Sequence, residues 1–449
     1  VQTCALPILI AQFDGGEDTV VYDAIFEPQF RAALFRAMQH RKSSRGEHGA
    51  VIGEVSRAFR ERLPSGEAMA STVLRAEQSN TSVLYGSDFF LKLYRRLDEG
   101  VNPDVEITRF LTDYAGFNNV PAYVGSVAYK GDKSEPRVLA MAEVFTQNQG
   151  DAWTMTLDIV GQFFERVLTE KPPLGSYTLP RLVDRDTRLE YPAEFLELTG
   201  GALAEQVRRL GERTAEMHLA LASNRSDSAF APEPYNVLYQ RSVYQSMRNM
   251  LRRTFQLLNR TIPSLTESVR ADAALVCARE KELLERVGRL IGRKIDANRI
   301  RIHGDYHLGQ VLHTGRDFVI IDFEGEPARA LSERRIKRSA MRDVAGMLRS
   351  YHYAVHTALH QQVAVRGSDV ESIIPWADCW YEYVSRGFLH AYLARAGDAD
   401  FVPDNPDDLE VVLDACLLDK AVYEVAYELN NRPDWLIVPL RGIIQILNR

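Results

Sequence analysis

Cysteine is scarce in this sequence of 449 residues, and no long apolar run occurs in it. Scattered single cysteines argue against a disulfide framework and against a cysteine-rich zinc site, and they are typical of a reducing, cytoplasmic compartment. No apolar run reaches the roughly 18 residues that a membrane-spanning helix needs, so we expect no membrane partner. The cysteines are Cys4, Cys277, Cys379 and Cys416.

The sequence also lacks an excess of positive charge. Lysine and arginine total 54, aspartate and glutamate total 61, and the formal net charge is −7. Nucleic-acid-binding proteins usually carry a basic excess, so this balance argues against a nucleic-acid partner. The apolar share of 45% and the charged share of 26% are ordinary for a folded globular protein.

Strand-like patterns are concentrated in the first third of the chain, and helical periodicity dominates after residue 146. We therefore predict an α+β fold with two lobes. A cap subdomain would cover residues 1–70, a β-rich N-lobe residues 71–146, and a helical C-lobe residues 147–449, with one β-rich island at 300–323. The expected helices of the C-lobe are 151–169, 200–223, 235–260, 264–292, 339–364, 375–396, 407–430 and 436–447.

Two aspartates, 17 positions apart, mark the β-rich island. Asp305 lies in a short polar loop, and Asp322 follows the apolar run 318–321. A carboxylate at the end of a buried strand is costly unless it is paired or binds a cation. Phosphoryl transfer from ATP needs a carboxylate to orient the attacking hydroxyl and oxygen ligands for Mg²⁺. Asp305 is therefore the candidate catalytic base, and Asp322 is a candidate metal ligand.

A third residue of the island completes this pattern. Gln310 stands five positions after Asp305, where the kinase catalytic loop carries a magnesium-binding asparagine. The glutamine oxygen is the same kind of hard ligand on a longer side chain, so we expect Gln310 to bind Mg²⁺ with Asp322.

Two histidines flank Asp305 and suggest a metal pair as an alternative. A glycine follows His303, and this favours a loop over the helix on which a zinc pair with His307 would normally lie. We expect His303 to brace the loop instead. Asp343, at the start of a later helix, is a further candidate for bracing it.

A single lysine interrupts an apolar strand at residues 89–94. Lys92 could be an edge residue that extends its amine to solvent. Alternatively it pairs with Glu106, 14 residues later, and holds the nucleotide phosphates, as in the kinase N-lobe. The usual glycine-rich loop is missing before it. Its phosphate contacts would come instead from the turn that contains Ser79, Asn80 and Thr81.

Taken together, these motifs resemble those of the maltokinases, which share the aminoglycoside-phosphotransferase-like variant of the protein-kinase fold. The resemblance implies transfer of phosphate from ATP, with Mg²⁺, to maltose. The product, maltose 1-phosphate, would feed α-1,4-glucan (glycogen) synthesis from trehalose, with a fused or separate trehalose synthase as partner. Because the chain begins with Val1, we expect a shortened cap or a piece of such a fusion. The matching stretches are 77–82, 91–97, 102–106, 303–310, 321–327 and 419–428.

The resemblance also implies where adenine and the acceptor would bind. Backbone groups at the end of a hinge strand, Glu143, Val144 and Phe145, would bind adenine. The acceptor side can be followed from helical spacing, because Lys420, Tyr423, Glu424 and Tyr427 share one helix face. That mixture of aromatic and charged groups suits a neutral sugar, although an amphipathic helix with core tyrosines gives the same pattern.

Two other functions remain open. A kinase of the same fold could act on an aminoglycoside, a choline-like amine or another sugar. A catalytically inactive nucleotide-binding scaffold is the other alternative, because Gln310 replaces the usual asparagine and the glycine-rich loop is missing.

Overall fold

The computed structural model describes most of the chain, in two compact units. The N-terminal unit contains residues 1–147 and 323–335, and the C-terminal unit contains residues 148–322 and 336–449. The short segment 323–335 thus belongs to the N-terminal unit, although it lies within the stretch that we assigned to the C-lobe. The described residues are 9–13, 19–57, 59, 69–74, 80–173, 181–183, 189–365 and 370–449.

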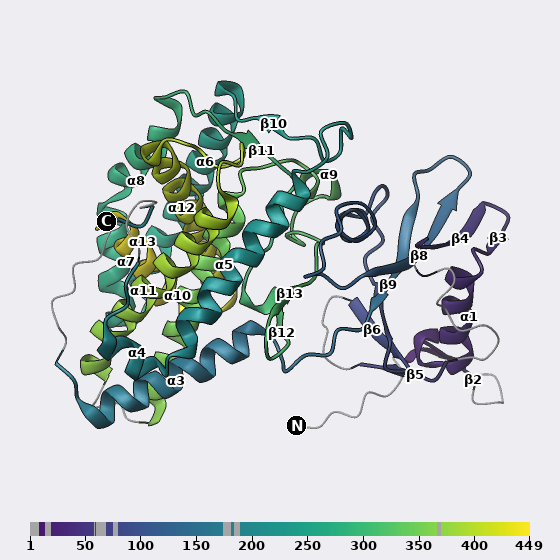
Figure 1. The fold of residues 1–449 in the computed structure, drawn as a ribbon, viewed down its shortest axis with the longest axis horizontal. Coiled ribbons are helices and arrows are strands. Elements are labelled where there is room, and N and C mark those ends of the chain that lie inside the picture. Colours follow the sequence, from purple (N-terminus) through teal and green to yellow (C-terminus); the bar gives the residue numbers. More distant parts are fainter. Residues whose placement is uncertain are drawn as a thin grey trace. The chain divides into compact units, whose positions relative to one another are not determined.

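Seven strands of the N-terminal unit form one antiparallel sheet in the order β3-β4-β8-β9-β7-β6-β5 (Figure 1). Strands β3 and β4 come from the region expected to form a separate cap, yet they extend the same sheet as the expected N-lobe. A separate hairpin joins β1 (Leu9–Phe13) to β2 (Thr19–Tyr22). The sheet strands are β3 (Ser43–Arg45), β4 (Gly49–Val55), β5 (Ser71–Val73), β6 (Asn80–Tyr85), β7 (Phe89–Tyr94), β8 (Tyr123–Gly131) and β9 (Arg137–Val144).

One face of this sheet packs against helix α1 (Pro28–Gln39). Phe35 and Met38 of the helix share a buried apolar cluster with Phe89 and Leu91 of β7. Because side chains alternate along a strand, Lys92 projects from the opposite face. Helix α2 (Pro103–Arg109) begins after an asparagine N-cap and continues as a π-turn, η2 (Phe110–Tyr114). It supplies a carboxylate that contacts Lys92.

Helices dominate the C-terminal unit, and the prediction of their positions is confirmed to within a few residues at most ends. The predicted helix over 264–292 is the main exception, because it breaks into two helices at Arg279. The helices are α3 (Ala152–Glu170), α4 (Ala193–Thr199), α5 (Ala202–Leu221), α6 (Val237–Thr261), α7 (Glu267–Ala278), α8 (Glu280–Gly288), α10 (Met341–Val365), α11 (Val370–Ala396), α12 (Pro406–Asn431) and α13 (Ile437–Leu447).

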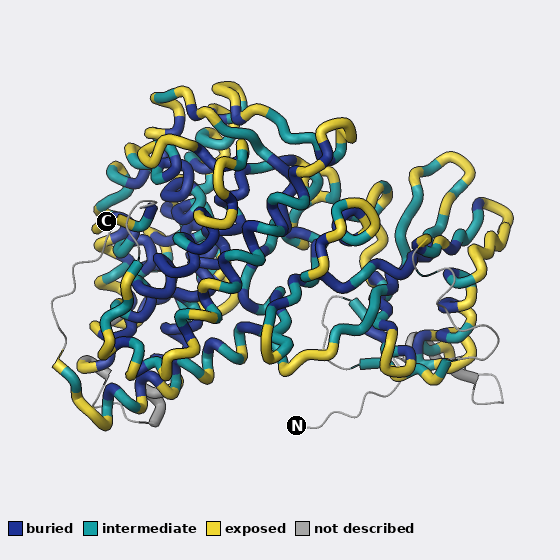
Figure 2. The backbone as a smooth tube through the Cα atoms, in the orientation of Figure 1, coloured by how far each residue is buried: buried dark blue, intermediate teal, exposed yellow. Residues whose placement is uncertain are grey.

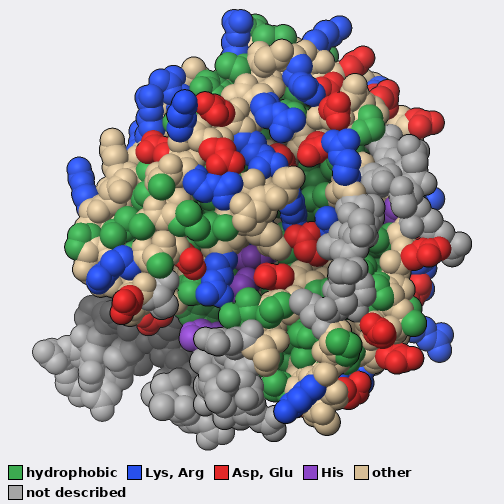
Figure 3. Space-filling view, turned by 90° about the vertical axis from the view of Figure 1, so that its left-hand side faces the viewer, with side chains coloured by type: hydrophobic (Ala, Val, Ile, Leu, Met, Phe, Trp, Pro, Cys, Tyr) green, Lys and Arg blue, Asp and Glu red, His purple; other side chains and the backbone are tan. Residues whose placement is uncertain are grey.

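The buried residues of this unit gather among α5, α10, α11 and α12 (Figure 2). Its surface carries both signs of charge, and Figure 3 shows basic and acidic side chains interspersed on one face. None of the helices among the described residues is long and apolar enough to cross a membrane.

The β-rich island forms a small hairpin, as the sequence predicts. Strand β12 (Val311–His313) pairs antiparallel with β13 (Phe318–Ile320), directly after the short 3₁₀ turn η5 (Leu308–Gln310). Val311 and Ile320 are opposite each other and both are buried. The hairpin therefore brings the polar residues at its two outer ends, Gln310 and Asp322, to one place.

Candidate active site

The loop that carries Asp305 is fixed from the start of α10. The buried carboxylate of Asp343 accepts hydrogen bonds from the backbone N–H groups of His303 (2.7 Å) and Gly304 (3.0 Å). Asp343 also lies 3.1 Å from Nε2 of His218 on α5. Burial opposes ionisation of this carboxyl, but His218 and the loop hold the pKa of Asp343 below its ordinary value. The prediction that Asp343 braces the loop is confirmed.

His303 ties the same loop to the hairpin. Its Nε2 lies 2.9 Å from the carbonyl oxygen of Ile321, just after β13. His307 instead accepts a hydrogen bond at Nδ1 from the N–H of Gly309 (3.1 Å). Each ring thus engages a backbone group, and this agrees with a bracing role for His303 rather than with a metal pair.

The two predicted metal ligands meet at the open end of the hairpin. Nε2 of Gln310 donates to Oδ2 of Asp322 over 2.8 Å. Asp322 has a φ of 68°, in the left-handed region that residues other than glycine seldom adopt. Such backbone strain is often found at functional sites. The Asp322 carboxylate and the Gln310 amide thus lie side by side, and both side chains carry the kind of hard oxygen ligand that Mg²⁺ prefers.

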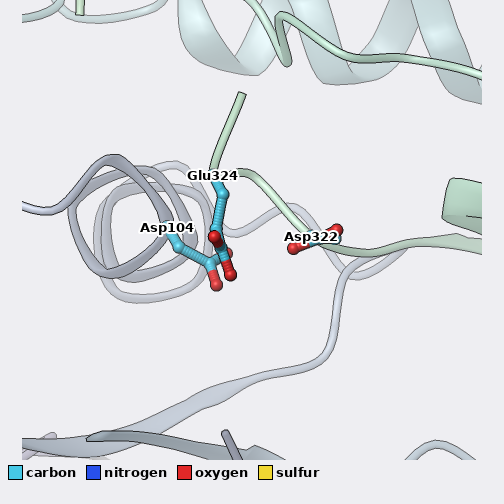
Figure 4. A group of neighbouring side chains, drawn as sticks. All are labelled: Asp104, Asp322 and Glu324. Carbon is cyan, nitrogen blue, oxygen red and sulfur yellow. The ribbon is translucent and has the colours of Figure 1, made fainter. Parts of the chain in front are cut away.

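In the N-terminal unit, Lys92 is buried and ion-paired rather than exposed at a sheet edge. Its Nζ lies 2.9 Å from Oδ2 of Asp104 and 3.3 Å from Oε1 of Glu324. Figure 4 shows the side chains of Asp104 and Glu324 next to each other. Asp104 also accepts hydrogen bonds from the hydroxyl of Tyr94 (2.9 Å) and from the N–H of Phe323 (2.9 Å).

The predicted pairing of Lys92 with Glu106 stays a prediction, and the structure adds Asp104 as a partner of the lysine. The carboxylate of Glu106 accepts two hydrogen bonds from the guanidinium of Arg335, at 3.0 and 2.6 Å. Asn102, which caps α2, places Asp104 on the side of the sheet.

The residues expected to cradle phosphate are partly engaged in other contacts. Nδ2 of Asn80 donates to Oε1 of Glu324 (2.6 Å), and the hydroxyl of Thr81 accepts from Nε of Arg95 (2.8 Å). Ser79 lies outside the described residues. A phosphate role for this turn stays a prediction.

The hinge residues are part of the sheet. Glu143 and Val144 are the last residues of β9. The N–H of Val144 donates to the carbonyl oxygen of Ala122 (2.9 Å), and the N–H of Phe145 donates to the carbonyl oxygen of Asp88 (2.8 Å). Neither N–H is therefore available to adenine. An adenine contact from Glu143, Val144 or Phe145 stays a prediction.

A cavity of about 710 Å³ lies within the C-terminal unit. This volume falls within the range of about 300–1,000 Å³ that is usual for small-molecule sites. Its wall includes Asp305 from the catalytic loop and all four residues predicted on the helix that is now α12. These four are Lys420, Tyr423, Glu424 and Tyr427. The structure thus brings together the candidate base and the candidate acceptor residues.

Sequence reasoning missed the other aromatic and polar groups of the cavity wall. Trp153 comes from α3, Tyr353 from α10, and Trp435 from the turn after α12. Each belongs to a helical pattern in which an aromatic residue usually packs in the core, so the sequence gives no signal that singles it out.

The acidic groups of the cavity wall are paired or used as helix caps. Asp151 accepts from the N–H of Thr154 (2.7 Å) at the start of α3. Burial raises the pKa of Tyr353, whose hydroxyl also contacts Glu428 (3.1 Å). A compensated wall of this kind suits neutral hydroxyl groups better than a strongly cationic ligand. The ion pairs are Asp305 with Lys420 (3.5 Å), Glu424 with Arg349 (2.7 Å) and Glu428 with Arg432 (2.7 Å).

Comparison with known proteins finds similarity to phosphotransferases. Residues 163–325 match the model of the phosphotransferase enzyme family. A glucosamine kinase from Streptacidiphilus jiangxiensis is 23% identical over 378 residues, which are 83% of this chain and 72% of that protein. A glucosamine kinase from Mycolicibacterium smegmatis is 24% identical over 380 residues, covering 84% of this chain and 79% of that protein.

A solved structure supports the same fold. The glucosamine kinase in complex with glucosamine, ADP and inorganic phosphate superposes with a TM-score of 0.66 at 20% identity, covering 96% of this chain and 86% of that one. The predicted kinase-like fold of the aminoglycoside phosphotransferase type is therefore confirmed. The expected cofactors, ATP and Mg²⁺, agree with the family match. Maltose as the acceptor gains no support from these relatives.

Proposed function

We propose that this protein is an ATP- and Mg²⁺-dependent kinase that phosphorylates a hydroxyl group of a small sugar. One observation carries the proposal: Asp305, on a loop fixed by a buried carboxylate, lines the same cavity as an aromatic and charged face of α12. A carboxylate that accepts the proton of a bound hydroxyl is the group that this chemistry requires.

Each part of the site would contribute a separate interaction. Asp305 would accept a hydrogen bond from the reacting hydroxyl and orient its oxygen, and Lys420 lies 3.5 Å from its carboxylate. Gln310 and Asp322 would hold Mg²⁺, which when bound neutralises charge on the nucleotide phosphates. In the N-terminal unit, Lys92 would contact those phosphates, and Asp104 would orient its amine together with the predicted partner Glu106.

The relatives named glucosamine kinase make glucosamine the first acceptor to test. Maltose is the second candidate, because the motif resemblance implies it and the cavity wall offers several aromatic faces. Glycogen synthesis from trehalose, and a trehalose synthase partner, depend on maltose being the acceptor. Aminoglycosides and choline-like amines are less favoured, because the described carboxylates of the cavity already have partners.

ADP release from ATP and Mg²⁺ tests the proposal across a panel of glucosamine, maltose, glucose, kanamycin and choline. We expect turnover of at least one sugar. Asp305→Asn should lower kcat by about 10²–10⁴-fold and leave the KM for ATP nearly unchanged. Asp398→Asn, which changes an exposed aspartate, serves as the matched control and should behave like the parent.

Two results would refute the proposal in different ways. Retention of parental kcat by Asp305→Asn would exclude this carboxylate as the base. Nucleotide binding without turnover of any sugar in the parent protein would support the inactive scaffold instead.

A further inference from the structure

His307 has a fixed tautomer. It precedes η5 in an extended conformation, and its Nδ1 lies 3.1 Å from the backbone nitrogen of Gly309. A backbone N–H can only donate, so Nδ1 must accept and carries no proton. The neutral ring therefore holds its proton on Nε2, and this nitrogen is a hydrogen-bond donor.

The position of the ring is fixed as well. A Cβ atom at Gly309 would lie 3.0 Å from Cε1 and 3.1 Å from Nδ1 of His307. These distances are shorter than most real Cβ contacts, so a side chain at position 309 would push on the ring. The glycine leaves room for His307 and also supplies the N–H that selects its tautomer.

The ring lines the cavity that also contains Asp305 and Lys420. Among the described residues, the one hydrogen bond recorded for this side chain is made by Nδ1, so Nε2 has a donor to offer. Burial lowers the pKa of His307, and Lys420 acts in the same direction, whereas Asp305 opposes it. The balance favours a neutral donor next to the carboxylate.

From this geometry we infer that His307 recognises the acceptor, by donating a hydrogen bond from Nε2 to a sugar oxygen next to the reacting hydroxyl. The inference rests on the proposed function. The reacting oxygen itself is a less suitable partner, because a hydrogen bond donated to it would withdraw electron density from the nucleophile. Asp305 takes the hydrogen bond of the reacting hydroxyl, and His307 would hold the ring oxygen or a neighbouring hydroxyl. An ammonium group cannot accept this bond, so the neighbouring position should require oxygen.

Two substitutions separate recognition from loop structure. In His307→Gln, the amide nitrogen can reach the place of Nε2 and keep the donor. In His307→Asn, the amide oxygen can replace Nδ1 and keep the contact with Gly309, but the donor is lost. Leaving a buried partner unpaired costs about 10- to 100-fold in affinity. We expect His307→Asn to lower kcat/KM for the sugar by this factor, mainly through a higher KM. The decrease in kcat/KM for His307→Gln should be several-fold smaller.

Deoxy analogues of the best acceptor identify the partner oxygen. The analogue that lacks this oxygen should give the same kcat/KM with the parent and with His307→Asn, whereas the other analogues keep the difference. The KM for ATP and the thermal unfolding midpoint should stay close to parental values in both variants.

The outcomes distinguish this inference from the proposed function. If the parent phosphorylates sugars and His307→Asn matches it, or if His307→Gln is as impaired as His307→Asn, the recognition role is wrong and the proposed function stands. The recognition role is likewise wrong if His307→Asn lowers kcat/KM by the same factor for every deoxy analogue. If the parent phosphorylates no sugar, the proposed function fails and the inference fails with it.

Discussion

The substitution Gly346→Ala should reduce catalysis without touching a chemical group of the site. Gly346 lies on α10, and a Cβ atom at this position would be 2.5 Å from the backbone oxygen of Tyr306, the residue after Asp305. Ordinary van der Waals contact begins at 3.4 Å, so the loop and the helix would have to separate by about 0.9 Å.

The loop cannot absorb this shift at one point. Tyr306 is buried, and its hydroxyl lies 2.8 Å from that of Thr214 on α5. The N–H of Leu308 donates to the hydroxyl of Ser350 (3.0 Å), and Asp343 holds the other side of the loop. The displacement must therefore spread to Asp305. A misplacement of about 1 Å in a catalytic group can cost about 10²-fold in rate.

Stability should change less than activity. Overpacking of this kind lowers the unfolding free energy by about 1–3 kcal/mol, whereas the higher helix propensity of alanine relative to glycine raises it by about 1 kcal/mol. Gly161→Ala on α3 is the matched control, because nothing lies within 4 Å of its Cβ position. We expect kcat to fall by about 10²-fold in Gly346→Ala. The control should keep parental kcat and gain about 0.5–1 kcal/mol in stability.

The assay is ADP release with the best acceptor, together with thermal unfolding of both variants. A parental kcat in Gly346→Ala, with the variant folded, would refute the reasoning, since it would mean that the loop tolerates the displacement.

Four further predictions follow from contacts within single units. Asp104→Asn should lower nucleotide affinity and cost about 3–5 kcal/mol in stability, because it removes a carboxylate that lies 2.9 Å from the buried β7 lysine. Glu106→Gln should cost about 1 kcal/mol or less through its ion pair with Arg335, and a loss of ATP affinity as large as that of Asp104→Asn in calorimetric titration would support the predicted orienting role of Glu106. Asp322→Asn should remove the dependence of ATP affinity on Mg²⁺, and a titration that still responds to Mg²⁺ would contradict its role as a ligand. Burial, with help from two nearby arginines, lowers the pKa of His356 to about 3, against about 6.5 in the unfolded chain. Protons then bind preferentially to the unfolded state, so the unfolding free energy should fall below pH 6.5 by up to about 1.4 kcal/mol per pH unit. His356→Gln should reduce this slope in urea titrations, and an unchanged slope would contradict the assignment.

The parts of the site that the sequence predicts are those that depend on local pattern. Asp322 follows an apolar strand, and Gln310 lies just before the partner strand, so a hairpin alone brings them within 2.8 Å. The acceptor face of α12 follows from helical spacing in the same way, and Lys420, Tyr423 and Tyr427 line one cavity.

The contact of Lys92 with Asp104 could not be predicted, because it depends on the phase of a helix relative to a strand. Asn102 caps α2, and Asp104 in the first turn of that helix reaches the lysine. The sequence offers carboxylates at positions 104 and 106, and a kinase-like spacing alone does not single out Asp104. The ion pair of Glu106 with Arg335 has no signal in the sequence either, because Arg335 lies 229 residues later.

The chain passes from one unit to the other within the run Asp322–Glu324. Asp322 accepts from Gln310 in the C-terminal unit, whereas Phe323 donates its N–H to Asp104 and Glu324 contacts Lys92 in the N-terminal unit. Three successive residues thus serve two separate sets of contacts. The left-handed φ of Asp322 lies at this change of direction, and glycine would adopt it with less strain. A glycine would lose the carboxylate, so a strained backbone at this position is what a metal-binding role for Asp322 requires.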